Sequence, residues 1–343
     1  MVSVYFLIPI LFFGSFMVTY LVTPFLIKRM HFRKITGKDM NKYDKREVAE
    51  MGGISVIFGF SFAVMISIFV HTYLGLDSLN LTVLLAAFST VILIGFIGVV
   101  DDLIGWRKGI RQWQHALFPL FAALPLMAVK IGFTEMTFPL FGAISFGIFY
   151  SLILIPIGIT GASNAFNMLA GHNGLESLLG IVCFVSLLAF NLVSFIFKPT
   201  GFNLEAIIIL TAMIGALAAF LKFNWHPAKI FPGDSLTLMN GALLAATVII
   251  GNMEKIGIVL MALFFVELIF KARHRFQSEC YGIPLKDGTL KARPEGGSLT
   301  QWVMRRGKFT EKQVVLIIVG MQVAVSILVA LYFYLNFIGV IEF

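Results

Sequence analysis

The chain has 343 residues, of which 59% are hydrophobic and 13% are charged. Soluble globular proteins carry roughly 25% charged residues, so this composition excludes an ordinary soluble domain and predicts an integral membrane protein. The net charge of +8 does not by itself indicate a nucleic-acid ligand, because basic residues accumulate on the cytoplasmic side of membrane proteins. The two cysteines, Cys183 and Cys280, are too few for a disulfide framework or a Cys-rich metal site.

Ten apolar segments approach the length of roughly 20 residues that a helix needs to cross a bilayer. We therefore predict an all-α polytopic membrane protein, one domain over residues 1–343, with about ten transmembrane helices. The first segment is too long for a cleavable signal peptide and lacks a basic start, so it is expected to remain as a span. The predicted spans are 3–27, 52–72, 80–100, 115–130, 139–161, 175–197, 204–221, 235–252, 255–270 and 313–337.

The basic residues predict the orientation of these spans. If loops alternate and the first loop is cytoplasmic, 23 of the 26 Lys and Arg residues lie on the cytoplasmic side, as the positive-inside rule expects. Both termini are then outside. Chemistry is expected in the charged cytoplasmic loops, which are about 28–51, 101–114, 162–174, 222–234 and 271–312.

The loop between predicted helices 9 and 10 carries signals for local structure. The turn Lys286-Asp287-Gly288-Thr289 predicts a small β-hairpin. Ser298 can cap a short helix with apolar residues on one side and Arg305-Arg306 beyond it. That pattern is typical of a helix lying in the membrane interface.

Three carboxylates lie at predicted helix ends. Asp101 and Asp102 follow an uncharged run of 23 residues, and Asp234 precedes one of 19. Adjacent carboxylates at a helix C-terminus oppose both each other and the helix dipole, so basic residues nearby or Mg²⁺ are expected to offset them. Asp234 is well placed to cap the helix that it opens. A solvated acidic helix end and simple capping are the structural alternatives.

The segment 164–176 carries three Asn, one His and two Gly between strongly apolar runs. Unpaired amides are costly beside lipid, so this segment needs partners. Asn164 and Asn167 are three residues apart and share a helix face. Their oxygens suit Mg²⁺, and hydrogen bonding between helices is the alternative.

Other charged residues permit two interpretations. Arg273-His274-Arg275 follows the ninth span, and Arg forks suit phosphate oxygens, although basic residues are routine at a cytoplasmic helix end. Glu176 and Glu267 lie in or beside spans, where a carboxylate either serves function or pairs with a basic neighbour. No role is predicted for three further histidines, His31, His71 and His226.

Taken in order, these motifs resemble those of the polyprenyl-phosphate N-acetylhexosamine-1-phosphate transferases over essentially the whole chain. Bacterial members typically have Asp where this chain has Ala170 and Asn173, and a His-rich motif where it has Arg273-His274-Arg275. Those differences, with the short loops, favour the dolichyl-phosphate branch in an archaeal version. The matching motifs are Gly37-Lys38-Asp39-x-Asn41-Lys42, Asp101-Asp102, Asn164-Ala-x-Asn167 with Gly171-x-Asn173-Gly174, Asn224-Trp225-x-Pro227 with Phe231-x-Gly233-Asp234, and the basic motif.

The resemblance implies transfer of N-acetylglucosamine-1-phosphate from UDP-N-acetylglucosamine to dolichyl phosphate, giving UMP and GlcNAc-diphosphodolichol. This is the first step of lipid-linked oligosaccharide assembly for N-glycosylation. Mg²⁺ is the implied cofactor, with Mn²⁺ as a substitute. The implied location is the cytoplasmic face of the cell membrane in an archaeon, or of the endoplasmic reticulum in a eukaryote. A homodimer and no nucleic-acid partner are also expected.

The resemblance also assigns roles to residues. Asn167 and Asp234 are expected to hold the metal, and Asp101, Asp102 and Asp234 to form the catalytic core. Binding of the nucleotide sugar is expected from Asn164, Asn173, Phe231, Arg273, His274 and Arg275, with Phe231 stacking on uracil. The family lysine that follows the paired Asp is displaced here, and Arg111 or Lys108 is expected to supply its charge.

Two other functions are consistent with the sequence. One is the same reaction with another UDP-N-acetylhexosamine or another polyprenyl phosphate. The other is a cation-coupled transporter of an anionic solute, which predicts functional residues near the bilayer midplane rather than at the helix ends.

Overall fold

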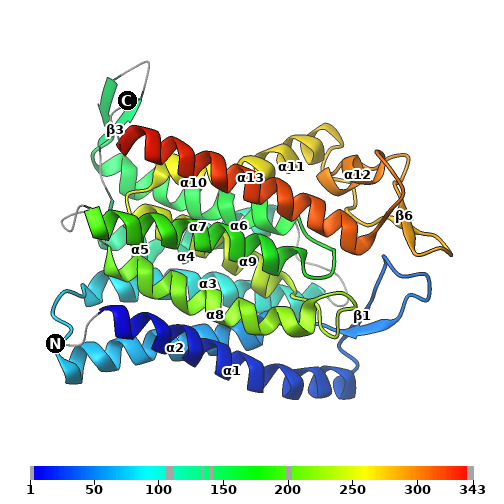
Figure 1. Cartoon of the computed structure of the whole chain (residues 1–343), viewed down its shortest axis with the longest axis horizontal. Helices are drawn as coiled ribbons and strands as arrows, with labels where there is room; N and C mark the ends of the chain where they lie inside the picture. Colours follow the sequence, from blue (N-terminus) through cyan, green and yellow to red (C-terminus); the bar gives the residue numbers. More distant parts are fainter. Residues whose placement is uncertain (1–3, 106–111, 133–134, 139–141, 198–202, 338–343) are drawn as a thin grey trace.

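The computed structural model describes residues 4–105, 112–132, 135–138, 142–197 and 203–337. It is a bundle of roughly aligned helices with small sheets at its two ends (Figure 1). Helix α1 (Val4–Arg33) begins and α13 (Glu311–Phe337) ends at one end of the bundle, whereas β1 (Thr36–Lys38), α12 (Leu299–Met304) and β6 (Thr289–Lys291) lie at the other end. We call this second end the site end.

Between α1 and α13 the chain forms further helices of very different lengths. In the described residues these are α2 (Gly53–Leu74), α3 (Leu81–Gly105), α4 (Gln112–Ala122), α5 (Leu124–Ala128), a π-helical turn η1 (Tyr150–Leu154) continued by α6 (Ile155–Met168), α7 (Leu175–Phe197), α8 (Leu204–Asn224), α9 (Asp234–Ile250), α10 (Glu254–Leu260) and α11 (Ala262–Arg273).

Seven helices of the described chain are long and apolar enough to cross a membrane, so the protein is a multi-pass membrane protein. The expected count of ten single spans is not reproduced. The predicted span 115–130 is divided into α4 and α5, with Pro125 in the first turn of α5, and 255–270 is divided into α10 and α11 at Met261. Helix α9 has only 17 residues.

The predicted span 139–161 does not match the helix in the structure, and its first residues, 139–141, lie outside the described residues. Residues 142–145 form strand β4, which pairs antiparallel with β3 (Glu135–Phe138), and the helix then continues to Met168. Hydropathy alone does not separate a short apolar strand from a helix. Because α6 extends to Met168, Asn164 and Asn167 are helical, and the expected loop 162–174 shortens to residues 169–174.

Helices α8 and α9 form the core of the bundle. Every residue of α9 after Asp234 is buried, and α8 is nearly as buried. Helices that are apolar on all faces are expected to be enclosed by others, and here α9 packs against α3 and α6, and α8 against α1 and α7. At Gly98 of α3 an added Cβ would lie 2.5 Å from the Asp234 carbonyl oxygen, so the glycine permits the close approach of α3 to the start of α9.

Two small sheets occupy the site end. β1 pairs antiparallel with β2 (Glu47–Ala49). The turn expected at 286–289 lies between β5 (Ile283–Pro284) and β6, and β7 (Phe309–Thr310) adds a third strand to them. Ser298 caps α12 by accepting a hydrogen bond from the Thr300 N–H. Most of α12 is buried against α11 and α13, so its apolar face packs onto protein rather than onto lipid.

Candidate active site

A cavity of about 570 Å³ lies at the site end of the bundle. Segments far apart in the sequence meet around it, and most of them are the ends of helices or the loops that join them. Its lining residues are Lys38, Asp39, Met40, Glu50, Asp101, Asp102, Asn167, 170–173, Glu176, 231–234, Thr237 and Tyr281. Such a pocket with converging polar groups is the expected form of a small-molecule site.

The paired carboxylates of α3 meet the beginning of α9. Asp102 accepts hydrogen bonds from the backbone N–H of Asp234 (2.7 Å) and of Ser235 (3.2 Å), so its two oxygens cap α9. The N-terminus of α9 therefore supplies positive potential that the C-terminus of α3 cannot. Gly233 has φ +72°, and a Cβ there would lie 2.4 Å from the Asp102 carboxylate. Only glycine permits this approach.

Asp234 opens α9, as predicted, but the capping oxygens belong to Asp102 rather than to its own side chain. Asp101 is buried at the same place and lines the cavity. Three carboxylates thus share one cavity wall. Of the basic residues expected to offset them, Arg111 and Lys108 lie outside the described residues.

Asn167, on helix α6, faces the same cavity. Its side-chain oxygen accepts a hydrogen bond from the Thr237 hydroxyl of α9 (3.0 Å), which fixes the orientation of the amide and still leaves a lone pair. Asn164, one turn earlier, is not among the lining residues, and its amide donates to the Thr160 carbonyl (2.9 Å).

The residues present fit a magnesium ion. In the described part of the chain, no three His, Cys, Asp or Glu side chains converge closely enough to enclose a metal. Mg²⁺ in phosphate sites is commonly bound by one or two protein oxygens, and water and substrate phosphates complete its shell. Asp234 and Asn167 offer oxygens of that kind on the cavity wall.

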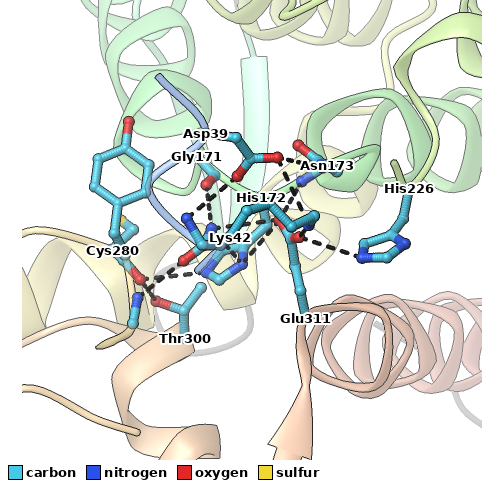
Figure 2. Close-up of polar contacts among 12 residues, drawn as sticks. Asp39, Lys42, Gly171, His172, Asn173, His226, Cys280, Thr300 and Glu311 are labelled. Carbon is cyan, nitrogen blue, oxygen red and sulfur yellow. Dashed lines mark hydrogen bonds and ion pairs between the residues drawn. The ribbon is translucent and has the colours of Figure 1, made fainter. Parts of the chain in front are cut away.

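The loop 169–174 also lines the cavity and carries the buried residue Asn173. The Asn173 amide donates to the Asp39 carboxylate (3.0 Å; Figure 2). Next to it, His172 is 3.2 Å from Asn41 Nδ2 and 3.2 Å from the Cys280 carbonyl oxygen. These partners assign a neutral imidazole that donates through Nε2 and accepts through Nδ1. Burial lowers the pKa of His172, and the nearby Glu311 carboxylate opposes that shift.

Phe231 also lines the cavity, beside Gly233 and Asp234. Its backbone is fixed to the segment that precedes α2: its N–H donates to the Ala49 carbonyl (2.8 Å), and its carbonyl accepts from the Gly52 N–H (2.9 Å). An aromatic ring on this well-anchored segment can present a face to a planar ligand.

The basic motif occupies a different place. Arg273, His274 and Arg275 follow one another at the end of α11 and are exposed, and none is among the residues that line the cavity. The His274 ring lies against Gly297, where an added Cβ would be 2.0 Å from Nδ1. The geometry therefore joins six predicted site residues in one cavity: Asp101, Asp102, Asn167, Asn173, Phe231 and Asp234.

Several lining residues were not predicted as site residues. Lys38 and Asp39 belong to the polar loop after the first span, whose charge is also typical of an ordinary cytoplasmic loop. Glu50 and Tyr281 come from separate segments, and burial raises the pKa of both side chains. Glu176 was recognised as an ambiguous carboxylate; one of its oxygens accepts from the Gly171 N–H (2.6 Å).

Comparison with known proteins identifies the family. The family described as glycosyl transferase family 4 matches residues 83–252. Two archaeal proteins provisionally named UDP-N-acetylglucosamine–dolichyl-phosphate N-acetylglucosaminephosphotransferases are similar to this chain. The protein of Saccharolobus solfataricus is 37% identical over 94% of this chain and 95% of its own length. The protein of Sulfolobus acidocaldarius is 33% identical over 93% of this chain and 94% of its own length. The phospho-N-acetylmuramoyl-pentapeptide-transferase of Streptococcus mutans is 32% identical over 68% of this chain and 69% of its own.

The fold is that of a multi-pass membrane protein, and the family match and the relatives give its class as a transferase. The chain belongs to the polyprenyl-phosphate N-acetylhexosamine-1-phosphate transferases of glycosyl transferase family 4.

Proposed function

We propose that this protein transfers N-acetylglucosamine-1-phosphate from UDP-N-acetylglucosamine to dolichyl phosphate. The observation that carries the proposal is the single cavity shared by Asp101, Asp102, Asp234, Asn167 and Phe231. It combines oxygen ligands for a metal, an aromatic face for a base and room for a nucleotide. The names of the two archaeal relatives point to the same donor and acceptor.

Mg²⁺ is the proposed cofactor, held by Asp234 and Asn167, with Mn²⁺ as a substitute. When bound, it would neutralise charge on the diphosphate of the donor. The Thr237 hydroxyl, which donates to the Asn167 oxygen, keeps that oxygen directed at the cavity.

The acceptor provides its own nucleophile. A phosphate monoester has a second pKa of about 6, so it is largely a dianion at neutral pH. Its oxygen attacks the β-phosphorus of the donor and forms the new P–O bond, while the bond from that phosphorus to the bridging oxygen breaks and UMP leaves. Asp102 supports this direct route, because both of its oxygens already accept backbone N–H groups, which makes it a poor nucleophile. We assign it the role of positioning Asp234.

The cytoplasmic side of the cell membrane is the proposed location of the site. The cavity lies at helix ends, where the phosphate of a lipid acceptor reaches the membrane surface. This position also disfavours the transporter hypothesis, which requires a site near the midplane.

A radiolabelled transfer assay tests the proposal. Purified protein in detergent receives labelled UDP-N-acetylglucosamine, dolichyl phosphate and Mg²⁺, with Asp234→Asn in parallel. Label that becomes extractable into butanol, requires Mg²⁺ and is lost in the variant is the expected result. If lipid product forms only with another UDP-sugar, that sugar nucleotide is the donor instead. A trapped phosphosugar–enzyme adduct would overturn direct attack by the acceptor phosphate.

A further inference from the structure

Glu311 is a buried carboxylate behind the wall of the cavity. It is the first residue of α13, and its side chain is only 2% exposed. An acidic residue in the first turn of a helix is ordinary, but that explanation accounts for neither the burial nor the contacts of this one.

The Glu311 carboxylate joins three segments that are distant in sequence (Figure 2). One oxygen accepts from the backbone N–H of Asn173 (2.9 Å) and from the amide of Asn41 (3.3 Å). The other oxygen forms an ion pair with Lys42 and lies 3.6 Å from His226 Nε2. The loop 169–174 and the loop after β1 are therefore both fixed to the start of α13.

Asn41 extends this connection to a fourth segment. Its amide donates to the Gly171 carbonyl (3.0 Å), and its side-chain oxygen accepts from the Gly282 N–H (3.0 Å). Gly282 follows Tyr281, which lines the cavity. Asn41 and Glu311 thus hold together loops that each supply a residue to the cavity wall.

Glu311 acts on the cavity through its neighbours. Its neighbours Asp39, His172 and Asn173 line the cavity. Glu311 and Lys42 are not among the lining residues of the described chain and lie behind these three. Asn173 is held from both sides, by Glu311 at its backbone N–H and by Asp39 at its amide nitrogen. The amide orientation is thereby set, and Oδ1 is the atom that it offers to a ligand.

The negative charge of Glu311 balances the partly buried cation of Lys42. Lys42 lies between Glu311 and Asp39, whose oxygen is 3.6 Å from its ammonium nitrogen. His172 and His226 also face Glu311, at 3.8 and 3.6 Å. Removing one partner of a buried ion pair leaves the other uncompensated, so loss of the Glu311 charge is expected to loosen Lys42, and with it the Asp39 wall.

We infer that Glu311 is a positioning residue for the nucleotide part of the donor, acting through Asn173 and Asp39. The inference rests on the proposed function, because it assumes that the uridine nucleotide of the donor occupies this side of the cavity. It extends the site to α13, which contributes no side chain to the described cavity wall.

The test separates positioning from stability. Glu311→Gln keeps the shape of the side chain and an acceptor for the Asn173 N–H, but removes the charge. A hydrogen bond to a charged acceptor is stronger than one to a neutral acceptor by a free energy that corresponds to about tenfold in affinity. We therefore expect KM for UDP-N-acetylglucosamine and the Kd of UMP, measured by calorimetry, to rise about tenfold. KM for dolichyl phosphate is expected to change less than twofold, and Glu311→Asp, which keeps the charge, is expected to lie closer to wild type.

Glu205→Gln is the matched control. Glu205 is also buried in the first turn of a helix, and it accepts from the backbone N–H of Asn80 (2.6 Å) away from the cavity. The Glu205→Gln variant is expected to have a lower melting temperature in detergent and unchanged KM values for both substrates. If Glu311→Gln does not fold, Lys42→Met removes the other half of the ion pair and must raise the same KM and Kd.

The inference is overturned if Glu311→Gln lowers stability but leaves the UMP Kd unchanged, or if it raises KM for both substrates equally. A wild-type protein that binds no UMP overturns it as well. A wild-type protein that binds UMP but makes no lipid product removes the proposed function only, because the effect of Glu311 on UMP binding is still measured.

Discussion

Asp102, near the C-terminus of α3, accepts a hydrogen bond from the backbone N–H of Asp234, 2.7 Å away at the start of α9. One carboxylate of the catalytic core thus positions the backbone of another. In Asp102→Asn, an amide NH₂ replaces one of the two oxygens that accept N–H groups. Loss of this cap is expected to cost about 1 kcal/mol of stability, and displacement of Asp234 to lower the transfer rate about a hundredfold.

The transfer rate and the melting temperature of Asp102→Asn check this expectation. Asp77→Asn, which changes an exposed carboxylate, serves as the control and is expected to match wild type in both. A variant with normal activity would show that Asp102 does not position Asp234.

Gly233 makes the approach of these two segments possible, and Gly233→Ala is expected to inactivate the protein. A Cβ at this position meets the Asp102 carboxylate, and the backbone has φ +72°. Gly288→Ala is a matched control, because φ is +82° there but nothing lies within 4 Å of the added Cβ. Both variants carry the strain of a left-handed alanine, about 1–2 kcal/mol. Only Gly233→Ala is expected to lose transfer activity, and equal losses would contradict the argument.

The meeting of Asp101, Asp102, Asn167 and Asp234 could be predicted, because each lies at the end of an apolar run on the same predicted face. The exact limits of the membrane spans could not be predicted. The apolar run that predicted the span 139–161 includes strand β4, and α9 is buried in the bundle rather than exposed to lipid. Glu311 gave no signal, because an acidic residue at a helix start is common and its partners lie far away in the sequence, the nearest of them being His226. The partner of His226 is that same Glu311, which explains why no role was evident from sequence.

Thr237 is expected to tune metal affinity. Its hydroxyl donates to the Asn167 oxygen (3.0 Å), and loss of a group that orients a metal ligand typically costs 10- to 100-fold in affinity or activity. Thr237→Val keeps the shape and removes this donor, so about tenfold more Mg²⁺ should be required for half-maximal transfer. Removal of metal with EDTA should abolish transfer in both proteins, and Mg²⁺ or Mn²⁺ should restore it.

Thr247→Val is the control for this measurement. Thr247 is a buried threonine of the same helix, and among the described residues its hydroxyl bonds to the Leu243 and Leu244 carbonyls of α9. Its Mg²⁺ requirement should equal that of wild type. An unchanged requirement in Thr237→Val would argue against Asn167 as a metal ligand.

His172 should make stability depend on pH. Burial lowers its pKa in the folded protein below the unfolded value of about 6.5, so between these two values the unfolded state binds more protons. Stability contributed by neutral His172 is therefore complete above about pH 6.5 and is lost as pH falls toward the folded pKa. Glu311 and Asp39 oppose this shift, and Lys42 reinforces it. The melting temperature of wild type should fall between pH 7.5 and 5.5, and that of His172→Gln should fall less; equal slopes would show that His172 does not carry the effect.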